Sequence, residues 1–310
     1  MNAYRHKWIA NFWIRLGAVL IDSLLLAVVG IVLGFFFQPI LVDLGSEGRL
    51  IGFFLAFMYF SVLNSRISGG QTIGKKVLNL RVVDATNEPI SLLKSMARYS
   101  VLGGPVFLNG IRLPESVVSS WLAYPLALIV TGGLLSSFYL YVFNRRTRQA
   151  LHDLVVGSFV VYVDVDKQAI KTVWPVHKAV VSCLFIIAVM FTFTAKRLTH
   201  LQGYQSLPVV QSKLSEDQSI NDSIVSVGVN TIRGKEGDVQ QINYVIAQVF
   251  LNQNRLDESH FAESLAKKII QEFPETAQKD TLRIVLIYGF DIGIWSHWLK
   301  QAYDFNPSQL

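Results

Sequence analysis

Residues 15–37, RLGAVLIDSLLLAVVGIVLGFFF, indicate that this chain enters a membrane. The 22 residues that follow Arg15 contain one charged side chain, Asp22. A helix of about 22 residues spans roughly 33 Å, and the hydrocarbon core of a bilayer is about 30 Å thick. The segment is long for the apolar region of a signal peptide, and further apolar segments follow it. We therefore predict an uncleaved transmembrane helix over residues 16–37.

The composition of the whole chain agrees with a membrane protein. Of its 310 residues, 51% are hydrophobic and 16% are charged, whereas about 25% are charged in an ordinary soluble domain. This composition disfavours both a fully soluble protein and an intrinsically disordered one. The single cysteine excludes a disulfide framework and a thiolate metal site. The six histidines show no pair at metal-ligand spacing, so we predict no metal site and no cofactor.

Four further apolar segments extend this prediction to about five spans. The N-terminus and residues 64–98 and 144–178 carry the Lys/Arg excess, which the positive-inside rule assigns to the cytoplasm. The chain must then cross an even number of times between these two basic segments. Residues 117–143 make one crossing, so the shorter segment before them is expected to make the other, unless it is re-entrant. The expected spans are residues 16–37, 48–64, 95–112, 117–143 and 177–195, with the C-terminal part extracytoplasmic.

Outside the spans the sequence predicts both strands and helices. Val77–Asp84 and Leu154–Val163 are rich in β-branched residues and are expected to be strands, the first as one arm of a hairpin. In the last third, strands are expected at Ile224–Ile232, Thr281–Phe290 and Ile292–Tyr303, and amphipathic helices at Asp238–Leu251 and Glu258–Phe273. The fold class is thus an α-helical integral membrane bundle followed by a small α+β extramembrane domain. The expected boundaries are residues 1–165 for the membrane domain, 166–198 for a connector with the fifth span, and 199–310 for the extracytoplasmic domain.

Asp22 lies where a charge is costly. A carboxylate in the hydrocarbon region costs about 2.5–3.5 kcal/mol on insertion scales. We expect it to face the bundle interior and to be paired, hydrogen-bonded or protonated. Two interpretations follow: an ion or proton site, or a structural acceptor that holds helices together.

Three segments resemble the RDD family of bacterial membrane proteins. They are RLGAVLIDSLLL (residues 15–26), SGGQTIGKKVLNLRVVD (68–84) and RQALHDLVVGSFVV (148–161). The arginine and two aspartates for which the family is named match Arg15, Asp22 and Asp153, which we take as the functional signature. The resemblance covers about residues 10–163. It implies a multi-pass protein of the bacterial cytoplasmic membrane, for which transport of unidentified ligands and cation/proton exchange have been suggested.

The charges near the cytoplasmic face suggest how these residues are arranged. Arg15 and Asp153 are both expected at this face, and we expect them to pair and so tie the first span to the segment after the fourth. Alternatively, they line one polar path together with Asp22, or Asp153 lies in solvent at the surface. Arg98 is expected to snorkel at the inner end of its span. The candidate supporting residues are Gln71, Gly74, Lys75, Arg98, Arg148 and His152.

Two functions fit these features. The first is transport of an unidentified ion or small ligand through a polar site around Asp22, because an intramembrane carboxylate is a functional candidate by default. A homo-oligomer would then help to enclose a path, since five spans are few for a transporter. The second is a non-catalytic scaffold or sensor whose C-terminal domain binds a partner. No catalytic residues stand out, so no enzyme is predicted, and the expected partners are the lipid bilayer and the ligand, without nucleic acid.

Overall fold

The computed structural model describes residues 8–113, 115–198, 206–233 and 239–310. They divide into two compact units. The described part of the chain contains four helices that are long and apolar enough to cross a membrane: Phe12–Asp43, Gly45–Leu63, Ala123–Phe143 and Pro175–Ala195. The fifth crossing expected at residues 95–112 is not among them.

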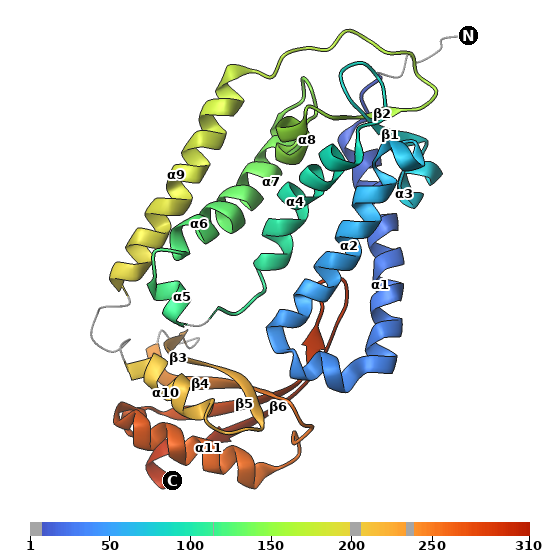
Figure 1. The fold of residues 1–310 in the computed structure, drawn as a ribbon. Helices are drawn as coiled ribbons and strands as arrows, with labels where there is room; N and C mark the ends of the chain where they lie inside the picture. The colour runs from blue at the N-terminus through green and yellow to red at the C-terminus, as the bar shows by residue number, and fades with distance from the viewer. Residues whose placement is uncertain (1–7, 114, 199–205, 234–238) are drawn as a thin grey trace. The chain divides into compact units, whose positions relative to one another are not determined.

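The first unit consists of residues up to 32, residues 49–195 and residues 292–295. Its helix α4 packs against α2, α7 and α8, and therefore lies inside the helical unit (Figure 1). Its helices are α1 (Phe12–Asp43), α2 (Arg49–Leu63), η2 (Arg66–Ser68), α3 (Ile73–Val77), α4 (Leu92–Leu108), α5 (Glu115–Ser119), α6 (Ala123–Ala127), the π-helical η3 (Leu128–Gly132), α7 (Gly133–Phe143), α8 (Leu151–Val156) and α9 (Pro175–Leu198).

Helix α1 changes direction near its end. Phe37 has non-helical dihedral angles, φ −124° and ψ 19°, and Pro39 follows inside the helix. Proline cannot donate the backbone hydrogen bond, and its ring clashes with the preceding turn, which explains the kink. The residues of α1 from 33 onward belong to the second unit.

A two-stranded antiparallel sheet joins two distant parts of the first unit. Strand β1 (Leu80–Val83) pairs with β2 (Phe159–Tyr162), with Leu80 opposite Tyr162. The strand expected within Val77–Asp84 is present as β1, but its main partner is β2, far along the chain, and the expected hairpin is reduced to a single bridge between Val83 and Pro89. The strand expected at Leu154–Val163 is also shorter than predicted, because its first residues form the end of α8.

The second unit is built on a four-stranded sheet. The sheet has the order β3-β4-β5-β6, and only the β4–β5 pair is parallel. A parallel pair needs a crossover connection, and helix α11 is part of the one between β4 and β5. The elements are η1 (Gly45–Gly48), α10 (Ser206–Leu214), β3 (Ile220–Arg233), β4 (Val239–Leu251), α11 (Ser259–Glu272), η4 (Pro274–Gln278), β5 (Thr281–Asp291), β6 (Ser296–Phe305) and η5 (Pro307–Gln309).

The helix predicted at Asp238–Leu251 was wrong, because this segment forms strand β4. Val245, Ala247, Val249 and Leu251 are all buried, which is the period of two expected for one face of a strand. The expected helix over Glu258–Phe273 is present as α11, and the two strands expected before the C-terminus are present as β5 and β6, which pair antiparallel.

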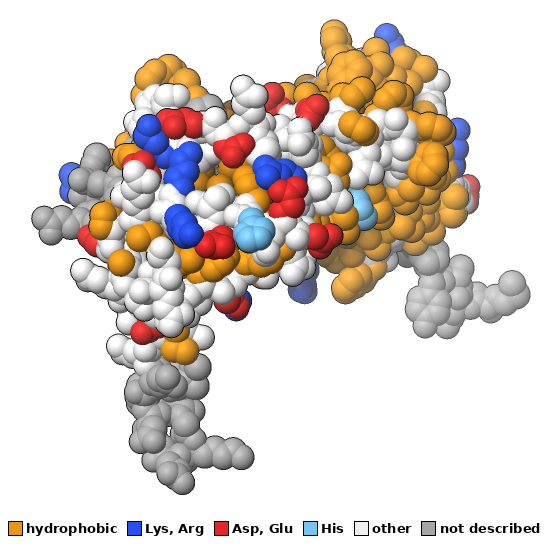
Figure 2. Space-filling model, turned by 90° about the horizontal axis from the view of Figure 1, so that it is seen from below, with side chains coloured by type: hydrophobic (Ala, Val, Ile, Leu, Met, Phe, Trp, Pro, Cys, Tyr) orange, Lys and Arg blue, Asp and Glu red, His pale blue; other side chains and the backbone are white. Residues whose placement is uncertain are grey.

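The long helices of the first unit expose large apolar side chains. On α1, Leu24 and Val28 are 69% and 58% exposed, and on α9 Phe191 is 69% exposed. Figure 2 shows broad apolar surfaces with few charges beside surfaces where both signs of charge mix. Exposed apolar area of this extent marks a protein or membrane contact, and on helices of spanning length it indicates contact with lipid.

Candidate functional site

A fully buried carboxylate, Asp153, joins three helices of the first unit. It lies in the first turn of α8 and is 0% exposed. Arg15 on α1 donates from Nη2 to Oδ2 at 2.7 Å, and Arg98 on α4 donates from Nη2 and Nε to Oδ1 at 2.7 and 2.9 Å. Removing either partner from such a pair leaves an uncompensated buried charge. The Arg15–Asp153–Arg98 triad therefore holds α1, α4 and α8 together.

Neighbouring groups complete the hydrogen bonding of this triad. Ser158 Oγ donates to Asp153 Oδ1 at 3.0 Å, and Arg15 Nη1 donates to the carbonyl oxygen of Arg148. Arg148 has a φ of 53°, and its own guanidinium donates to the carbonyl oxygen of Ile9 at 3.1 Å. Arg148 therefore contributes through its backbone.

A second buried carboxylate, Asp22, has a separate set of partners. Its Oδ1 accepts from Tyr59 Oη at 2.7 Å and from the backbone N–H of Gly74 at 2.8 Å, and its Oδ2 accepts from Thr72 Oγ1 at 2.6 Å. Asp22 is 0% exposed, as expected for a hydrogen-bonded residue that faces the bundle interior. Helix α3 approaches α1 closely, because a Cβ on Gly74 would lie 2.1 Å from the carbonyl oxygen of Ala18.

Lys75 on α3 lies beside the Asp22 site. It is 5% exposed, and its Nζ lies 3.3 Å from Thr72 Oγ1, which in turn donates to Asp22. Burial, reinforced by the positive charge of Arg98, lowers the pKa of Lys75 to about 7. The lysine is therefore close to half-protonated at neutral pH.

The charges around Asp153 decide which neighbours carry a proton. Burial alone would raise the pKa of Asp153, but the positive charges of Arg98 and Arg15 outweigh it and hold this pKa well below its usual range. Burial lowers the pKa of His152 to about 3, so its ring is neutral near pH 7. Two arginines therefore face the one carboxylate of Asp153, and a protonated Lys75 adds a further positive charge.

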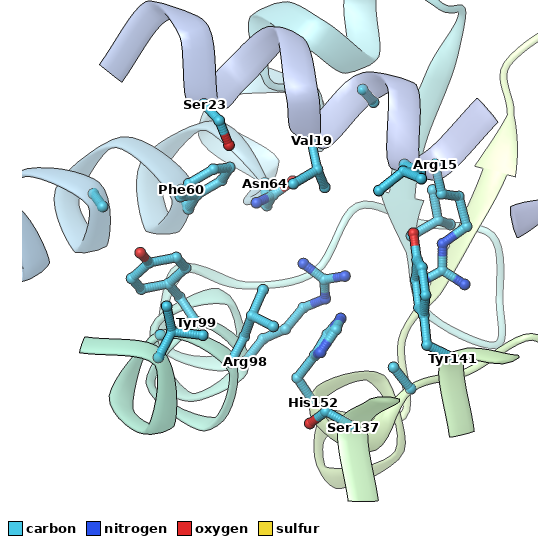
Figure 3. A pocket seen from close by; sticks show the side chains of 18 of the residues that line it. Arg15, Val19, Ser23, Phe60, Asn64, Arg98, Tyr99, Ser137, Tyr141 and His152 are labelled. Atoms are coloured by element: carbon cyan, nitrogen blue, oxygen red, sulfur yellow. The ribbon is translucent and has the colours of Figure 1, made fainter. Parts of the chain in front are cut away.

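A cavity of about 490 Å³ borders this charge centre. Within the described chain, the charged side chains that line it are Arg15, Lys75 and Arg98, all cationic. Neither Asp22 nor Asp153 is part of the lining. In Figure 3 the side chains of Arg98 and His152 point toward one another, and the guanidinium of Arg15 lies beside the ring of Tyr141. The cavity therefore presents positive charge, whereas the carboxylates that compensate it lie behind the wall.

Two polar side chains of the wall have atoms without partners among the described residues. Asn64 Oδ1 and His152 Nδ1 are buried and accept or donate no hydrogen bond. Asn64 is 2% exposed and His152 is 5% exposed, and His152 Nε2 lies 3.5 Å from Asp153 Oδ2. Buried polar atoms normally have partners, so both are available to a ligand.

The structure brings most of the sequence-predicted residues together. The expected pair of Arg15 with Asp153 is present, and Gly74, Lys75, Arg148 and His152 lie in or beside the two carboxylate sites. Gln71 lies outside them, with its Nε2 donating to the carbonyl oxygen of Leu80 at 2.7 Å.

The expectation that Arg98 snorkels was wrong, because it is buried and paired with Asp153. Sequence reasoning also missed Tyr59, Thr72 and Asn64. These are neutral polar residues, and no charge pattern singles them out. Within the described residues there is no group of three or more His, Cys, Asp or Glu that could hold a metal ion.

Comparisons with known proteins agree with this architecture. The profile of the RDD family matches residues 9–157, which include both carboxylates and both arginines of the site. The chain is 28% identical over 162 residues to a protein named "Uncharacterized protein YckC" from Bacillus subtilis (strain 168), covering 52% of this chain and 88% of that protein. No solved structure matches. Residues 9–157 thus form a membrane domain that belongs to the RDD family.

Proposed function

We propose that the RDD-family domain is a transport module whose ligand is an anion, bound in the cavity beside Arg15, Lys75 and Arg98. One observation carries this proposal: among the described residues, every charged side chain of the cavity lining is cationic. Cationic side chains with fixed donors favour carboxylate and phosphate ligands. The ligand site then lies beside Asp22 and not on it.

The surroundings of the carboxylates argue against a cation as the ligand. Asp22 already accepts three hydrogen bonds, and Asp153 already binds two arginines. A cation at either carboxylate would have to displace these donors, and at Asp153 it would meet two guanidinium groups. Asp22 is better explained as the acceptor that fixes α2 and α3 against α1.

We also propose which side of the membrane the charged end of the cavity faces. The Lys/Arg excess of residues 64–98 and 144–178 favours the cytoplasmic side for the ends of the helices that carry the charge centre. The anion would then reach Lys75 and Arg98 near the cytoplasmic surface of the membrane. A second copy of the chain would serve to enclose a path across the bilayer.

A ligand panel on the purified full chain tests the anion against the cation. Thermal unfolding is followed in a neutral detergent at constant ionic strength, with sodium decanoate and sodium phosphate as anion probes and potassium and calcium chlorides as cation probes. A ligand that binds only the folded state raises the unfolding midpoint. We expect at least one anion probe to raise it, and the cations to leave it unchanged.

Two variants sharpen this panel. Lys75→Gln removes a cation from the cavity wall and is expected to lose most of the anion effect. Asp22→Asn can keep all three hydrogen-bond contacts, because its amide oxygen accepts from Tyr59 and Gly74 and its NH₂ donates to Thr72; it is expected to retain the anion effect. Stabilisation by a cation that Asp22→Asn abolishes would instead support an ion site at Asp22.

One specific observation favours a second function, that of a scaffold or sensor. Residues 206–310 contribute a core of their own, formed by residues of β4, β5 and α11 that include Val245, Ile284 and Ala266. A separately packed α+β part suits a scaffold or sensor that binds a partner outside the membrane. If neither anions nor cations shift the unfolding midpoint, this second function is favoured.

A further inference from the structure

The cavity is charged at one end and apolar along most of its wall. Beyond Arg15, Lys75 and Arg98, the lining consists mainly of apolar side chains that include Leu26, Phe60, Leu102, Phe107, Leu134 and Phe138. The rings of Phe60 and Tyr99 stack with centroids 5.1 Å apart along this wall (Figure 3). A small hydrophilic anion would occupy the charged end and leave the apolar part unfilled, and empty apolar cavities bind apolar molecules.

The apolar part of the cavity is bordered by exposed side chains. Val19 on α1, Val106 on α4 and Phe138 on α7 all line it and are 40%, 43% and 69% exposed. Helices α1 and α7 lie within candidate membrane spans. Such side chains border hydrocarbon in a bilayer, so an acyl chain can enter between these helices without crossing a polar barrier.

The charged end offers more than positive charge. The unpartnered polar groups of Asn64 and His152 lie at this end of the wall, near the guanidinium of Arg98 (Figure 3). A neutral imidazole can donate from one nitrogen, whereas the unpartnered atom of Asn64 is its amide oxygen, which can only accept. His152, Arg98 and Lys75 therefore provide the donors that an oxyanion headgroup requires.

We propose that the cavity holds an anionic amphiphile, with a carboxylate or phosphate monoester headgroup at Arg15, Lys75 and Arg98 and a single acyl chain along the apolar wall. This inference rests on the proposed anion-binding function and adds the chemical class of the ligand. The volume of about 490 Å³ falls within the range of about 300–1,000 Å³ that is typical of small-molecule sites.

Photolabelling of the full chain in nanodiscs of phosphatidylcholine tests the proposal. The probe is palmitic acid with a diazirine on its chain, and the labelled residues are mapped by mass spectrometry. The competitors are palmitate, hexadecanol, acetate, inorganic phosphate and palmitoyl lysophosphatidic acid. The last two distinguish a free phosphate from a lipid headgroup, and hexadecanol has the chain without the charge.

Three variants separate the headgroup from the chain. Lys75→Gln removes a charged donor, which is expected to weaken palmitate binding about tenfold or more. Leu102→Trp fills the apolar part and is expected to abolish labelling there. Lys94→Gln, on the same helix as Arg98 but exposed, is the matched control and should bind as the unmodified chain does. Thermal unfolding of each variant shows that it is folded.

The proposal requires labels on wall residues such as Phe60 and Leu102, competition by palmitate or lysophosphatidic acid, and weak competition by hexadecanol. Competition by acetate or phosphate as strong as by palmitate, unaffected by Leu102→Trp, would overturn the amphiphile but leave the anion-binding function standing. Labelling that hexadecanol blocks equally well and Lys75→Gln does not weaken would overturn both.

Discussion

The negative charge of Asp153 compensates two buried arginines of the membrane domain. It is fully buried, and two guanidinium groups from different helices donate to it. Replacing Asp153 by asparagine would leave Arg15 and Arg98 buried without a counter-charge. Removing one partner of a buried ion pair costs about 3–5 kcal/mol. We expect Asp153→Asn to lower the unfolding free energy by this amount, measured by denaturant titration of the detergent-solubilised chain.

An exposed ion pair provides the control for this prediction. Arg283 Nε lies 2.6 Å from Asp304 Oδ1, and these side chains are 48% and 52% exposed. Exposed pairs contribute about 0–1 kcal/mol, so Asp304→Asn should change the unfolding free energy little. Equal effects of the two substitutions would contradict the role given to the triad.

Lys75 gives the site a pH dependence of known sign. Its pKa in the folded chain is about 7, below the ordinary 10.5. Above pH 7 the folded lysine loses its proton while the unfolded one keeps it, so the unfolding free energy is expected to rise between about pH 7 and 10.5. The affinity for an anion should fall over the same pH range, because the cavity loses a positive charge. The charged and titratable groups that face Lys75 are Arg15 and Asp22 on α1, Arg98 on α4, and His152 and Asp153 on α8.

Binding of sodium decanoate between pH 6 and 8.5 measures this effect. The arginines keep their protons throughout, and the pKa values of His152 and Asp153 lie below this range. Lys75→Arg is the control, because it keeps its charge and should make binding nearly independent of pH. A decrease in binding that Lys75→Arg shares with the unmodified chain would assign the titration to another group.

At the scale of residues, the sequence predicted the charges of the site better than its neutral partners. Arg15 and Asp153 carry opposite charges and were both expected at the cytoplasmic face, so their pairing could be predicted. The pairing of Arg98 with the same carboxylate did not, because these residues are 55 positions apart and no periodicity relates them. Tyr59 and Thr72 complete the Asp22 site as uncharged hydrogen-bond donors, which composition and charge cannot reveal.

Among the elements, the position of α3 depends on a glycine, Gly74, which has no side chain. Gly74 lies against the backbone of α1 and donates its N–H to Asp22. Gly74→Ala would force α3 away from α1 and weaken this hydrogen bond. Overpacking of this kind costs about 1–3 kcal/mol, and we expect the thermal unfolding midpoint to fall accordingly.

Gly104 on α4 is the matched control for Gly74. A Cβ at this position would meet nothing within 4 Å. Because alanine favours a helix over glycine by about 1 kcal/mol, Gly104→Ala should be neutral or stabilising. Destabilisation by Gly104→Ala as large as that by Gly74→Ala would show that the contact with α1 is not the cause.

The elements also show where periodicity misleads. In β4, apolar residues occur on both faces of the strand, and Phe250 is buried beside Val249 and Leu251. An apolar segment of this length with residues at i, i+3 and i+4 fits a helix as well as a strand. Hydrogen bonding to β3 and β5 makes the segment a strand. A single sequence does not show that pairing. Helix α11 was predicted because its opposite face is polar.

For the whole molecule, the number of crossings depends on α4. This helix has 17 residues, about 26 Å of rise, and it begins with a polar turn that contains Lys94. It nevertheless packs against α2, α7 and α8, as a crossing helix would. Five crossings place Leu310 on the side opposite the N-terminus, and four place both on the same side.

A topology reporter decides between these counts. We expect alkaline phosphatase fused after Leu310 to be active, and the same enzyme fused after Arg148 to be inactive. Activity after Arg148 together with inactivity after Leu310 would show that α4 does not cross. The membrane character and the basic flanks were predictable from composition, whereas the number of crossings was not, because α4 is shorter and less apolar than the other spans.

The central claim is that the cavity of the RDD-family domain binds an anion through Arg15, Lys75 and Arg98. Native mass spectrometry of the full chain, extracted from its host membrane into neutral detergent, tests it most directly. The account predicts an adduct whose released mass is that of an acidic amphiphile, reduced at least tenfold in Lys75→Gln and unchanged in Lys94→Gln. An adduct of a neutral lipid or a metal cation, or an acidic adduct equally abundant in Lys75→Gln, would contradict it.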